Sequence, residues 1–528
     1  MPTQRLETRL FVDWDNNGDY VGTYDNITSD VLEVSFTRGR DYASQLSGNS
    51  ISGTLTARIS NPDGKYSPSN ASSVLAGNML PARPVQLDMR VGVIENFPYT
   101  FPFSFDAEPT VTWTGYLERI TPTPAVHGVK TCTVTAYGSL GYLNDFRPTL
   151  ETQIDKRTDE VIGAILDDVG WSSSLRELAT GQTTLTRYWT DGPKTLDALR
   201  IIEETEGGFI KEGKDGKIIF ENRHTRIQSP YDTPQAVFSD SSSATNSYTT
   251  LNQEDPLSTI TNHVEASSRT YSTQALAVLW THPEYGENSP FLQPGEERTY
   301  EAIYPNPSSP RNALEVSEWT TPVASTDIVA NTEWNGSGTD ITSSITITVG
   351  SSDKTATRML VTLKNTHTLY GAYLTTMQAR GTGVWSNDPV KVRSIDTVSQ
   401  AKFGERKYAS DSEFFPTSQN AQLWCDYYNS IFGSPLPILS MQINANQSDA
   451  MQQQIMARDI SDRITVEADN NAGLGIDADF FIESVRQSIK KGGYEHQVTY
   501  KLSPASGGYS QFWVLDTGKI GASTVPAY

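Results

Sequence analysis

The residues best placed for binding chemistry form an oxygen-rich run near the N-terminus. Side-chain oxygens recur there at every second position before a turn that contains glycine, and the four residues are Asp13, Asp15, Asn17 and Asp19. The start of an EF-hand loop wraps a hard cation with this spacing, so the run predicts a structural calcium site. Tyr24 stands where such a loop carries its bidentate glutamate. The alternative is an Asx-rich β-turn whose carboxylates bind their own backbone.

A second acidic group, made of Glu203, Glu204 and Glu206, lies near the end of an expected helix. Two carboxylates held ~5 to 9 Å apart across a cleft could hydrolyse a glycoside. A chain with 62 acidic residues offers many such pairs, however. A solvated helix face explains this cluster more simply, and we assign no catalytic residue to it.

The other motifs of catalysis and metal binding do not occur in the sequence. The six histidines are scattered and form neither HxH nor HExxH, and there is no GxSxG, Walker or GxGxxG motif. The two cysteines, Cys132 and Cys425, are far apart, so we expect buried free thiols. These observations predict a protein that is not an enzyme and that needs no cofactor beyond the possible structural calcium.

The length and the charge of the chain predict several domains and disfavour a nucleic-acid-binding protein. A chain of 528 residues is too long for one hydrophobic core, so several domains are expected. The formal net charge is −21 and Lys and Arg are nowhere concentrated, which disfavours sequence-specific or tight binding of nucleic acid. No window approaches the ~18 apolar residues of a membrane span, and the N-terminus does not resemble a signal peptide. We therefore expect synthesis in a cytoplasm and no membrane span.

The elements that position these residues are mostly strands. Apolar and polar residues alternate from Leu10 to Leu143 and again after about residue 259, with Gly- and Pro-containing turns between the runs. Helical spacing appears at 160–169, at 195–204 and between Ala421 and Ile431. The sequence therefore predicts a small α+β unit between two β-rich regions.

Several short runs resemble tail proteins encoded by long-tailed phages and prophages. Those at 12–19, 36–41 and 61–68 are similar to the opening of such proteins, and the helix and hairpin at 196–220 look like the module of baseplate hub proteins. Lys402-Phe-Gly-Glu-Arg406 resembles the return segment of those hubs, and the run from Gln511 to Gly518 resembles a common ending of tail proteins. Because each motif is short, the resemblance rests on their order along the chain.

The resemblance to the tail-tip and baseplate hub family implies a mainly β fold with two tail-tube-like β-barrels, a small α+β module and an inserted β-sandwich. The expected parts are an N-terminal barrel at 1–151, the α+β hub module at 152–228, a second barrel at 229–272 and 389–505 with a helix at 418–432, the inserted β-sandwich at 273–388, and a C-terminal tail at 506–528.

The same resemblance implies a homotrimer at the tail tip of a virion. Two barrels from each of three chains would form a pseudo-sixfold ring that continues the tail tube and adapts it to a threefold tip. The implied neighbours are the tail tube or distal tail protein above, the tape measure protein, and a tail fibre, tip or spike protein below. DNA would cross this ring during ejection, and a wall without phosphate-binding cations would let it slide.

Two other functions remain as alternatives. A receptor- or carbohydrate-binding adhesin would use aromatic residues of the insert to stack on sugars, and the candidates are Trp319, Trp334, Tyr370, Tyr373 and Trp385. Most aromatic residues of a β-sandwich fill its core instead. A cell-wall hydrolase has only the surplus of carboxylates in its favour.

Calorimetric titration with calcium tests the oxygen-rich run. We expect heat of binding with the wild-type chain, and none with the Asp13→Ala/Asp15→Ala variant, because two of the proposed ligands are then missing. A wild-type titration without heat would end the calcium interpretation.

Overall fold

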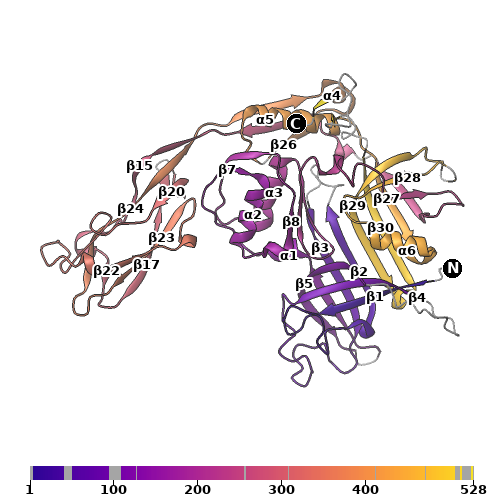
Figure 1. The fold of residues 1–528 in the computed structure, drawn as a ribbon, viewed down its shortest axis with the longest axis horizontal. Coiled ribbons are helices and arrows are strands. Elements are labelled where there is room, and N and C mark those ends of the chain that lie inside the picture. The colour runs from indigo at the N-terminus through magenta and orange to yellow at the C-terminus, as the bar shows by residue number, and fades with distance from the viewer. Residues whose placement is uncertain are drawn as a thin grey trace.

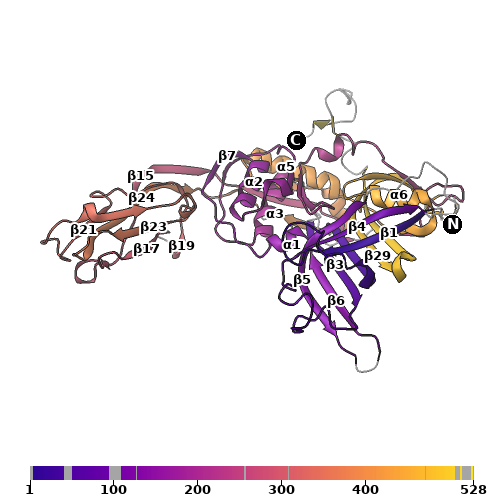
Figure 2. The same cartoon turned by 60° about the horizontal axis from the view of Figure 1, so that its bottom comes forward.

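The structure is a computed structural model that describes residues 4–40, 50–93, 109–125, 128–254, 257–306, 309–410, 412–469, 471, 473–505, 512–513 and 525–526. The fold is mainly β, as predicted. Figures 1 and 2 show a broad sheet, a helical module beside it, and a β-rich arm that projects away from both. The expected C-terminal tail lies outside the described residues except for β31 (Phe512–Trp513) and β32 (Val525–Pro526), which pair with each other.

The N-terminal part of the sheet has six antiparallel strands in the order β1-β4-β5-β6-β3-β2. They are β1 (Gln4–Val12), β2 (Val31–Arg40), β3 (Ser50–Ser60), β4 (Pro84–Val93), β5 (Thr110–Thr123) and β6 (Thr131–Tyr137). The period of two predicted from the sequence is visible in β3, where Leu55, Ala57 and Ile59 are fully buried and the residues between them are exposed.

The second part of the sheet comes from the far end of the chain. Its strands are β12 (Val237–Ser239), β13 (Thr250–Glu254), β27 (Ile438–Asn444), β28 (Arg463–Glu467), β29 (Asp477–Lys490) and β30 (Glu495–Pro504). It joins the first part because β2 pairs with β29, from Glu33 opposite Lys490 to Gly39 opposite Ser484. The result is one sheet of 12 strands, called here the joined sheet, over one shared hydrophobic core.

The pairings among the described strands leave the joined sheet open. Its longest path runs from β1 to β13 and never returns to β1, so the two expected barrels are two parts of one sheet. Helix α6 (Asp449–Ala457) covers part of it with Met451 and Ile455.

The α+β module lies beside the joined sheet and has its own hydrophobic core. It contains α1 (Ser139–Leu143), β7 (Gln153–Arg157), α2 (Thr158–Asp168), β8 (Arg176–Leu178), β9 (Thr184–Tyr188), α3 (Thr195–Glu206), β10 (Phe209–Glu212) and β11 (Ile218–Glu221). Leu196, Leu199 and Ile202 give α3 its apolar face, and Gly207 ends the helix in a left-handed conformation with φ of 68°.

Part of the region that was expected to form the second barrel is instead a separate layer with its own small sheet and core. Helix α5 (Ser418–Phe432) packs on a small sheet, and its Trp424 and Tyr428 form a separate core with that sheet. The strands of this sheet are β14 (His263–Ser268), β25 (Val390–Ile395) and β26 (Lys407–Ala409), with α4 (Thr397–Phe403) after β25. The Thr417 hydroxyl caps α5 by accepting from Asn420 N at 3.1 Å.

The insert is a β-sandwich, and it forms the arm in Figures 1 and 2. One sheet contains β15 (Tyr271–Thr281), β16 (Phe291–Leu292), β20 (Val316–Thr320), β21 (Ile328–Asn331) and β24 (Ala372–Ser386). The other contains β17 (Glu297–Ile303), β22 (Ile345–Thr348) and β23 (Arg358–Asn365). A two-stranded sheet of β18 (Pro305–Asn306) and β19 (Ser309–Ala313) completes it.

Polar contacts connect the insert to the α+β module. Glu315 lies 3.5 Å from Arg187 Nη1 and accepts from the Thr152 hydroxyl at 3.1 Å. Burial raises the pKa of Glu315 to about 7. The backbone of Ala356 donates to Leu150 O at 2.8 Å. The base of the insert is therefore held by specific contacts as well as by its connecting strands.

Cys132 and Cys425 are both buried free thiols, which confirms the prediction. Within the described ranges, no helix combines the length and the apolar character that a membrane crossing requires.

The burial of His496 should make the stability of the protein depend on pH. It is buried in β30, 2.8 Å from the Gln487 side-chain oxygen, and burial lowers its pKa to about 4. In the unfolded chain the imidazole takes up a proton near pH 6.5, whereas in the folded chain it stays neutral until the pH approaches 4. The stability of the folded state is therefore unaffected by His496 protonation above pH 6.5 and falls as the pH drops from 6.5 toward 4. Over this window, we expect the free energy of urea unfolding to fall about 3 kcal/mol further for wild type than for His496→Gln. Parallel pH profiles would contradict this.

Candidate functional surface

The most extensive organised surface of the joined sheet is its polar face, defined by four rows of side chains that cross the strands in register. Row one is Tyr137, Thr54, Thr37, Arg486, Thr499, Gln442 and Thr250. Row two is Thr135, Thr56, Ser35, Ser488, Gln497 and Asn444. Row three is Thr133, Arg58, Glu33, Lys490 and Glu495. Row four is Ser484, Lys501, Ser440 and Asn252.

Side chains alternate between the two sides of each strand, so the polar face and the core lie on opposite sides of the joined sheet. The row residues are exposed or half-buried, whereas the residues between them, such as Phe36, Leu55 and Val498, are buried on the other side. Thr37 and Thr54 contact each other through their hydroxyls at 2.9 Å. The polar face therefore continues from the N-terminal part of the sheet across the β2–β29 pairing into the second part.

Hydroxyl and amide groups dominate the polar face, and its charges are of both signs. Arg58 pairs with Glu33 at 2.9 Å, and Lys490 lies in register between Glu33 and Glu495. Such exposed pairs contribute little to stability. Their effect is to keep the face from becoming a continuous basic strip.

A buried ion cluster lies behind this surface, where the two parts of the sheet meet the α+β module. Glu483 on β29 binds Arg40 at 2.9 Å and Arg226 at 2.6 Å, and all three side chains are at most 2% exposed. Burial alone would raise the pKa of Glu483, but Arg226 and Arg40 outweigh it and lower the pKa to about 2. The Arg40 guanidinium also stacks 3.5 Å from the centre of the Phe209 ring.

The β10–β11 hairpin extends the buried polar contacts to both parts of the sheet. Lys211 pairs with Glu221 inside the hairpin and donates to Ile460 O at 2.8 Å. Glu212 accepts from Gly53 N at 2.8 Å and from Leu140 N at 2.7 Å, and burial raises its pKa to about 7. The hairpin thus holds β3, on one side of the junction, and the segment before β28, on the other.

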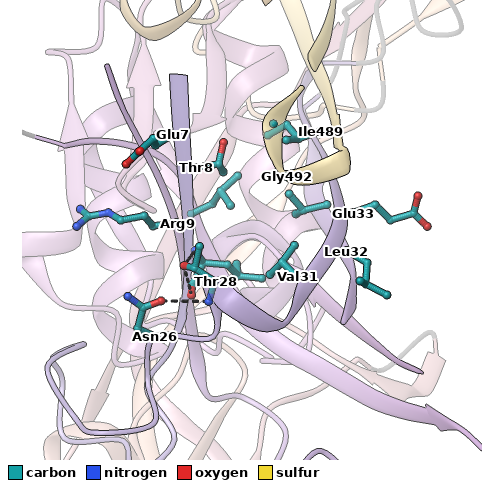
Figure 3. Close-up of a pocket in the computed structure, with 14 residues that line it drawn as sticks. Glu7, Thr8, Arg9, Asn26, Thr28, Val31, Leu32, Glu33, Ile489 and Gly492 are labelled. Atoms are coloured by element: carbon teal, nitrogen blue, oxygen red, sulfur yellow. Dashed lines mark hydrogen bonds between the residues drawn. The ribbon is translucent and has the colours of Figure 1, made fainter. Parts of the chain in front are cut away.

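The strand path of the joined sheet ends at β1 and β13, and a side branch through β28 ends at β12. Among the described strands, β4 alone forms a ladder with β1, and β27 alone does so with β13. A cavity of about 350 Å³ borders β1 (Figure 3). Its walls include Glu7 and Thr8 of β1, Val31 and Leu32 of β2, and Gly493 in the turn before β30. The last residues of β1 are bonded by the segment 25–27, through Val12 N to Asp25 O at 2.9 Å and Ile27 N to Leu10 O at 3.0 Å. The recess therefore lies beside the earlier part of β1, which has β4 as its one ladder partner among the described strands.

The four residues of the oxygen-rich run lie in the loop after β1. Asp13 is 1% exposed, and its two carboxylate oxygens accept from Asn17 N at 3.1 Å and from Gly18 N at 2.9 Å. Asn17 in turn accepts from Asp19 N at 3.0 Å, while Asp15 is exposed. The Asn17 contact is an Asx turn, and the Asp13 carboxylate closes a longer loop by binding backbone groups four and five residues on. Across the described residues, no group of three or more His, Cys, Asp or Glu side chains is arranged to hold a metal, and the calcium site stays a prediction.

The interpretation of the acidic cluster on α3 as a solvated face is wrong. Glu203 is 3% exposed and accepts from Ile210 N at 2.8 Å, and burial raises its pKa to about 7. Glu206 is fully buried and accepts from the Thr158 hydroxyl at 2.9 Å, while Glu204 binds an aromatic hydroxyl on β26. The three carboxylates bind neighbouring elements, because α3 is enclosed by the module and by the α5 layer.

The insert aromatics proposed for sugar binding are separated by the fold. Trp319 is buried in the sandwich core and Tyr373 is half-buried on β24. Trp334 and Tyr370 are exposed in loops, and Trp385 is exposed near the end of β24. Only the exposed residues are available to a ligand.

Sequence reasoning missed the buried ion cluster. Its signal is an isolated charge within an apolar strand, as in the run Phe480-Phe-Ile-Glu-Ser-Val485 around Glu483. The two arginines that neutralise this charge lie 443 and 257 residues away in sequence. The acidic residue is therefore visible in the sequence, but its partners are not.

Replacing Arg226 with Met tests the buried cluster. Glu483 would keep its burial and lose one of its two cations, so we expect a loss of about 3 to 5 kcal/mol in the free energy of unfolding by urea. The Arg40→Met/Arg226→Met/Glu483→Gln triple variant should recover part of this, because the amide needs no counter-charge and neither arginine is left buried without its carboxylate. Arg58→Met removes an exposed ion pair and should cost less than about 1 kcal/mol. Equal effects of Arg226→Met and Arg58→Met would refute the assignment.

Comparison with known proteins finds no matching family model and no matching curated protein. Solved structures that align with most of the chain include a tail protein from Neisseria meningitidis MC58, 10% identical, with a TM-score of 0.49 over 96% of this chain and 98% of that one. The 43 kDa tail protein of prophage MuSo2 from Shewanella oneidensis is 10% identical, with a TM-score of 0.46 over 94% and 98%. A prophage tail protein from Listeria monocytogenes EGD-e is 9% identical, with a TM-score of 0.39 over 94% of each chain. Similarity at this level leaves the function to be argued from the residues of this chain.

Proposed function

We propose that this chain is a structural hub protein of a phage tail tip, and that three copies form a ring that continues the tail tube. The observation that carries the proposal is the joined sheet, which has a polar face across both parts and a free strand at each end. The resemblance of short sequence runs to tail and hub proteins agrees with it. In this proposal the chain has a structural role and no enzymatic one.

The free edges support a closed ring of identical copies. β1 and β13 are different strands at opposite ends of the strand path, so a contact between them would be head-to-tail. Head-to-tail contacts generate rings when the rotation closes. Unpaired strand edges are also the positions where another chain adds most readily to a sheet.

Three copies would supply six sheet parts, two from each chain. A ring with this arrangement presents sixfold pseudo-symmetry to the tail tube or distal tail protein above and threefold symmetry to a fibre, tip or spike protein below. The tape measure protein would end at the same position before ejection. The buried ion cluster supports this role, because it fixes the angle between the two parts that must act as equivalent neighbours.

The polar face is the proposed wall of the channel. Duplex DNA adheres to surfaces that offer several unpaired cations to its phosphates. The polar face instead carries mainly Thr, Ser and amide side chains. Arg58 and Lys490 lie next to carboxylates, whereas Arg486 and Lys501 lie in different rows among hydroxyl side chains, so the face has no continuous basic strip. DNA could pass such a wall during ejection without being held. The protein would be assembled in the host cytoplasm and would act in the virion.

Electron microscopy of purified tails, or of rings assembled from the full chain, tests the proposed architecture. We expect threefold symmetry, with the joined sheets side by side and the polar faces toward the axis. A stable monomer in solution is compatible with assembly on the growing tail, so the decisive sample is the assembled particle. A ring of another order, or a polar face turned outward, would contradict the proposal.

Lysine substitutions on the polar face test its inertness toward DNA. We expect the wild-type chain to leave linear duplex DNA unretarded in a gel at low salt, and the Thr37→Lys/Thr54→Lys/Thr499→Lys variant to retard it in a salt-dependent manner. These residues flank Arg486 in one row, so the variant creates a basic strip. The matched control adds three lysines to exposed positions of the insert, Thr281, Thr346 and Thr348. Strong retardation by the wild type, or equal retardation by the control, would contradict the proposal.

A further inference from the structure

Three loops converge at the end of the insert farthest from its connecting strands. Phe291 on β16 and Asn331 on β21 both pair with Tyr373 near the start of β24. The loops 332–340 and 366–371 therefore emerge at the end of the sheet where β24 begins. The loop 283–290 lies close by, at the edge of the sheet beside the first residues of β24, where Leu374 N donates to Pro290 O at 2.8 Å. The connection to the rest of the chain lies at the other end of β24, and Figure 2 shows β21 toward the outer part of the arm.

Each of the three loops exposes an aromatic ring. Tyr285 is 44% exposed, Trp334 41% and Tyr370 53%, and the neighbouring Leu369 is 77% exposed. We call these four residues and Phe291, which is 38% exposed, the tip surface.

The loops of the tip surface are packed against each other. A Cβ placed on Gly286, next to Tyr285, would lie 3.9 Å from the Trp334 ring, so these two loops are in contact. A Cβ on Gly371 would come within 2.1 Å of the Phe291 ring, which shows that this ring closes over the third loop. Gly371 adjoins Tyr370, and the exposed rings thus belong to one continuous set of loops.

Internal hydrogen bonds hold these loops in place. The Asn331 amide donates to Gly336 O at 3.3 Å and to Gly338 O at 3.2 Å, which closes the loop that carries Trp334. His367 Nδ1 accepts from Leu369 N at 3.1 Å and from Tyr370 N at 3.0 Å. A surface organised in advance loses less conformational entropy when it binds a ligand. The exposed rings are therefore held in fixed positions before any ligand binds, which favours a role in binding.

The charge of the tip surface restricts the ligand. The segments 282–292, 331–341 and 365–373 contain no Lys or Arg, whereas they contain Glu284 and Glu333 among other acids. Phosphate, sulfate or uronate groups would be repelled. Between the rings lie carboxylates, amides and hydroxyls that can accept and donate hydrogen bonds. Protein partners prefer a contiguous apolar centre, which this alternation of rings and polar groups does not provide.

We propose that the tip surface binds a neutral oligosaccharide. Sugar rings would place their C–H faces against Tyr285, Trp334 and Tyr370, and their hydroxyls would donate to the neighbouring carboxylates and amides. The proposal places carbohydrate binding at one end of the insert. This binding would be an additional function of the chain and does not depend on the hub role.

Binding of the full chain to an array of neutral hexose and N-acetylhexosamine oligomers tests the proposal, with sulfated and uronic-acid oligomers beside them. We expect binding to members of the neutral set, weakened about tenfold by Trp334→Ala and by Tyr370→Ala, because each removes one stacking ring. Trp385→Ala is the matched control, since this ring is 55% exposed but lies on the strand outside the three loops. Thermal unfolding of each variant checks that the fold is kept.

Three results would overturn the proposal. They are the absence of binding to every neutral oligomer, binding confined to anionic glycans or to a protein, and an equal loss of binding in Trp385→Ala. None of them bears on the symmetry of the assembled particle, which tests the hub role separately.

Discussion

The antiparallel pairing of β2 with β29 connects the two ends of the chain, and the rest of the architecture depends on it. Seven residue pairs, from Glu33 opposite Lys490 to Gly39 opposite Ser484, bring strands some 450 positions apart into one sheet. This register aligns the polar rows and gives both parts a shared core. A slip of one residue would turn every side chain of β29 to the opposite face, so the core and the polar face depend on the same alignment.

The buried charges near this pairing add specificity to the hydrophobic core. Apolar residues can pack in many similar ways, but Glu483 is neutralised only where Arg40 from β2 and Arg226 from the module reach it together. A buried carboxylate without these cations would cost several kcal/mol. Alternative packings of the three parts are therefore penalised, even where they would bury a similar apolar area.

Local features of the structure follow closely from the sequence. The helices predicted at 160–169 and 195–204 are α2 and α3, with ends that differ from the prediction by at most two residues. Alternation identified strands such as β6 and β30. Periodicity reports burial within one element, which is why it succeeded at this level.

Features that depend on distant pairing were not predictable in this way. Alternation assigns Thr54 and Thr499 to the polar sides of their own strands, but nothing local shows that these sides form one surface. The same reason explains the error at Glu203 and Glu206, whose spacing fits a solvated helix and whose burial comes from neighbouring elements. The exposed rings of the insert were partly recognised, but only the pairing of β16 and β21 with β24 brings their loops close together.

The insert also has a simple connection to the rest of the molecule. It leaves at Tyr271 and returns at Ser386, and these residues are direct partners across β15 and β24. Paired residues lie about 5 Å apart, so the outer part of the segment could be exchanged without moving the strands on either side, as long as the contacts of Glu315 and Ala356 with the α+β module are kept. Recombination within one stretch of the gene could then replace the tip surface while leaving the registers of the joined sheet intact. The two surfaces of this protein are thus free to diverge at different evolutionary rates.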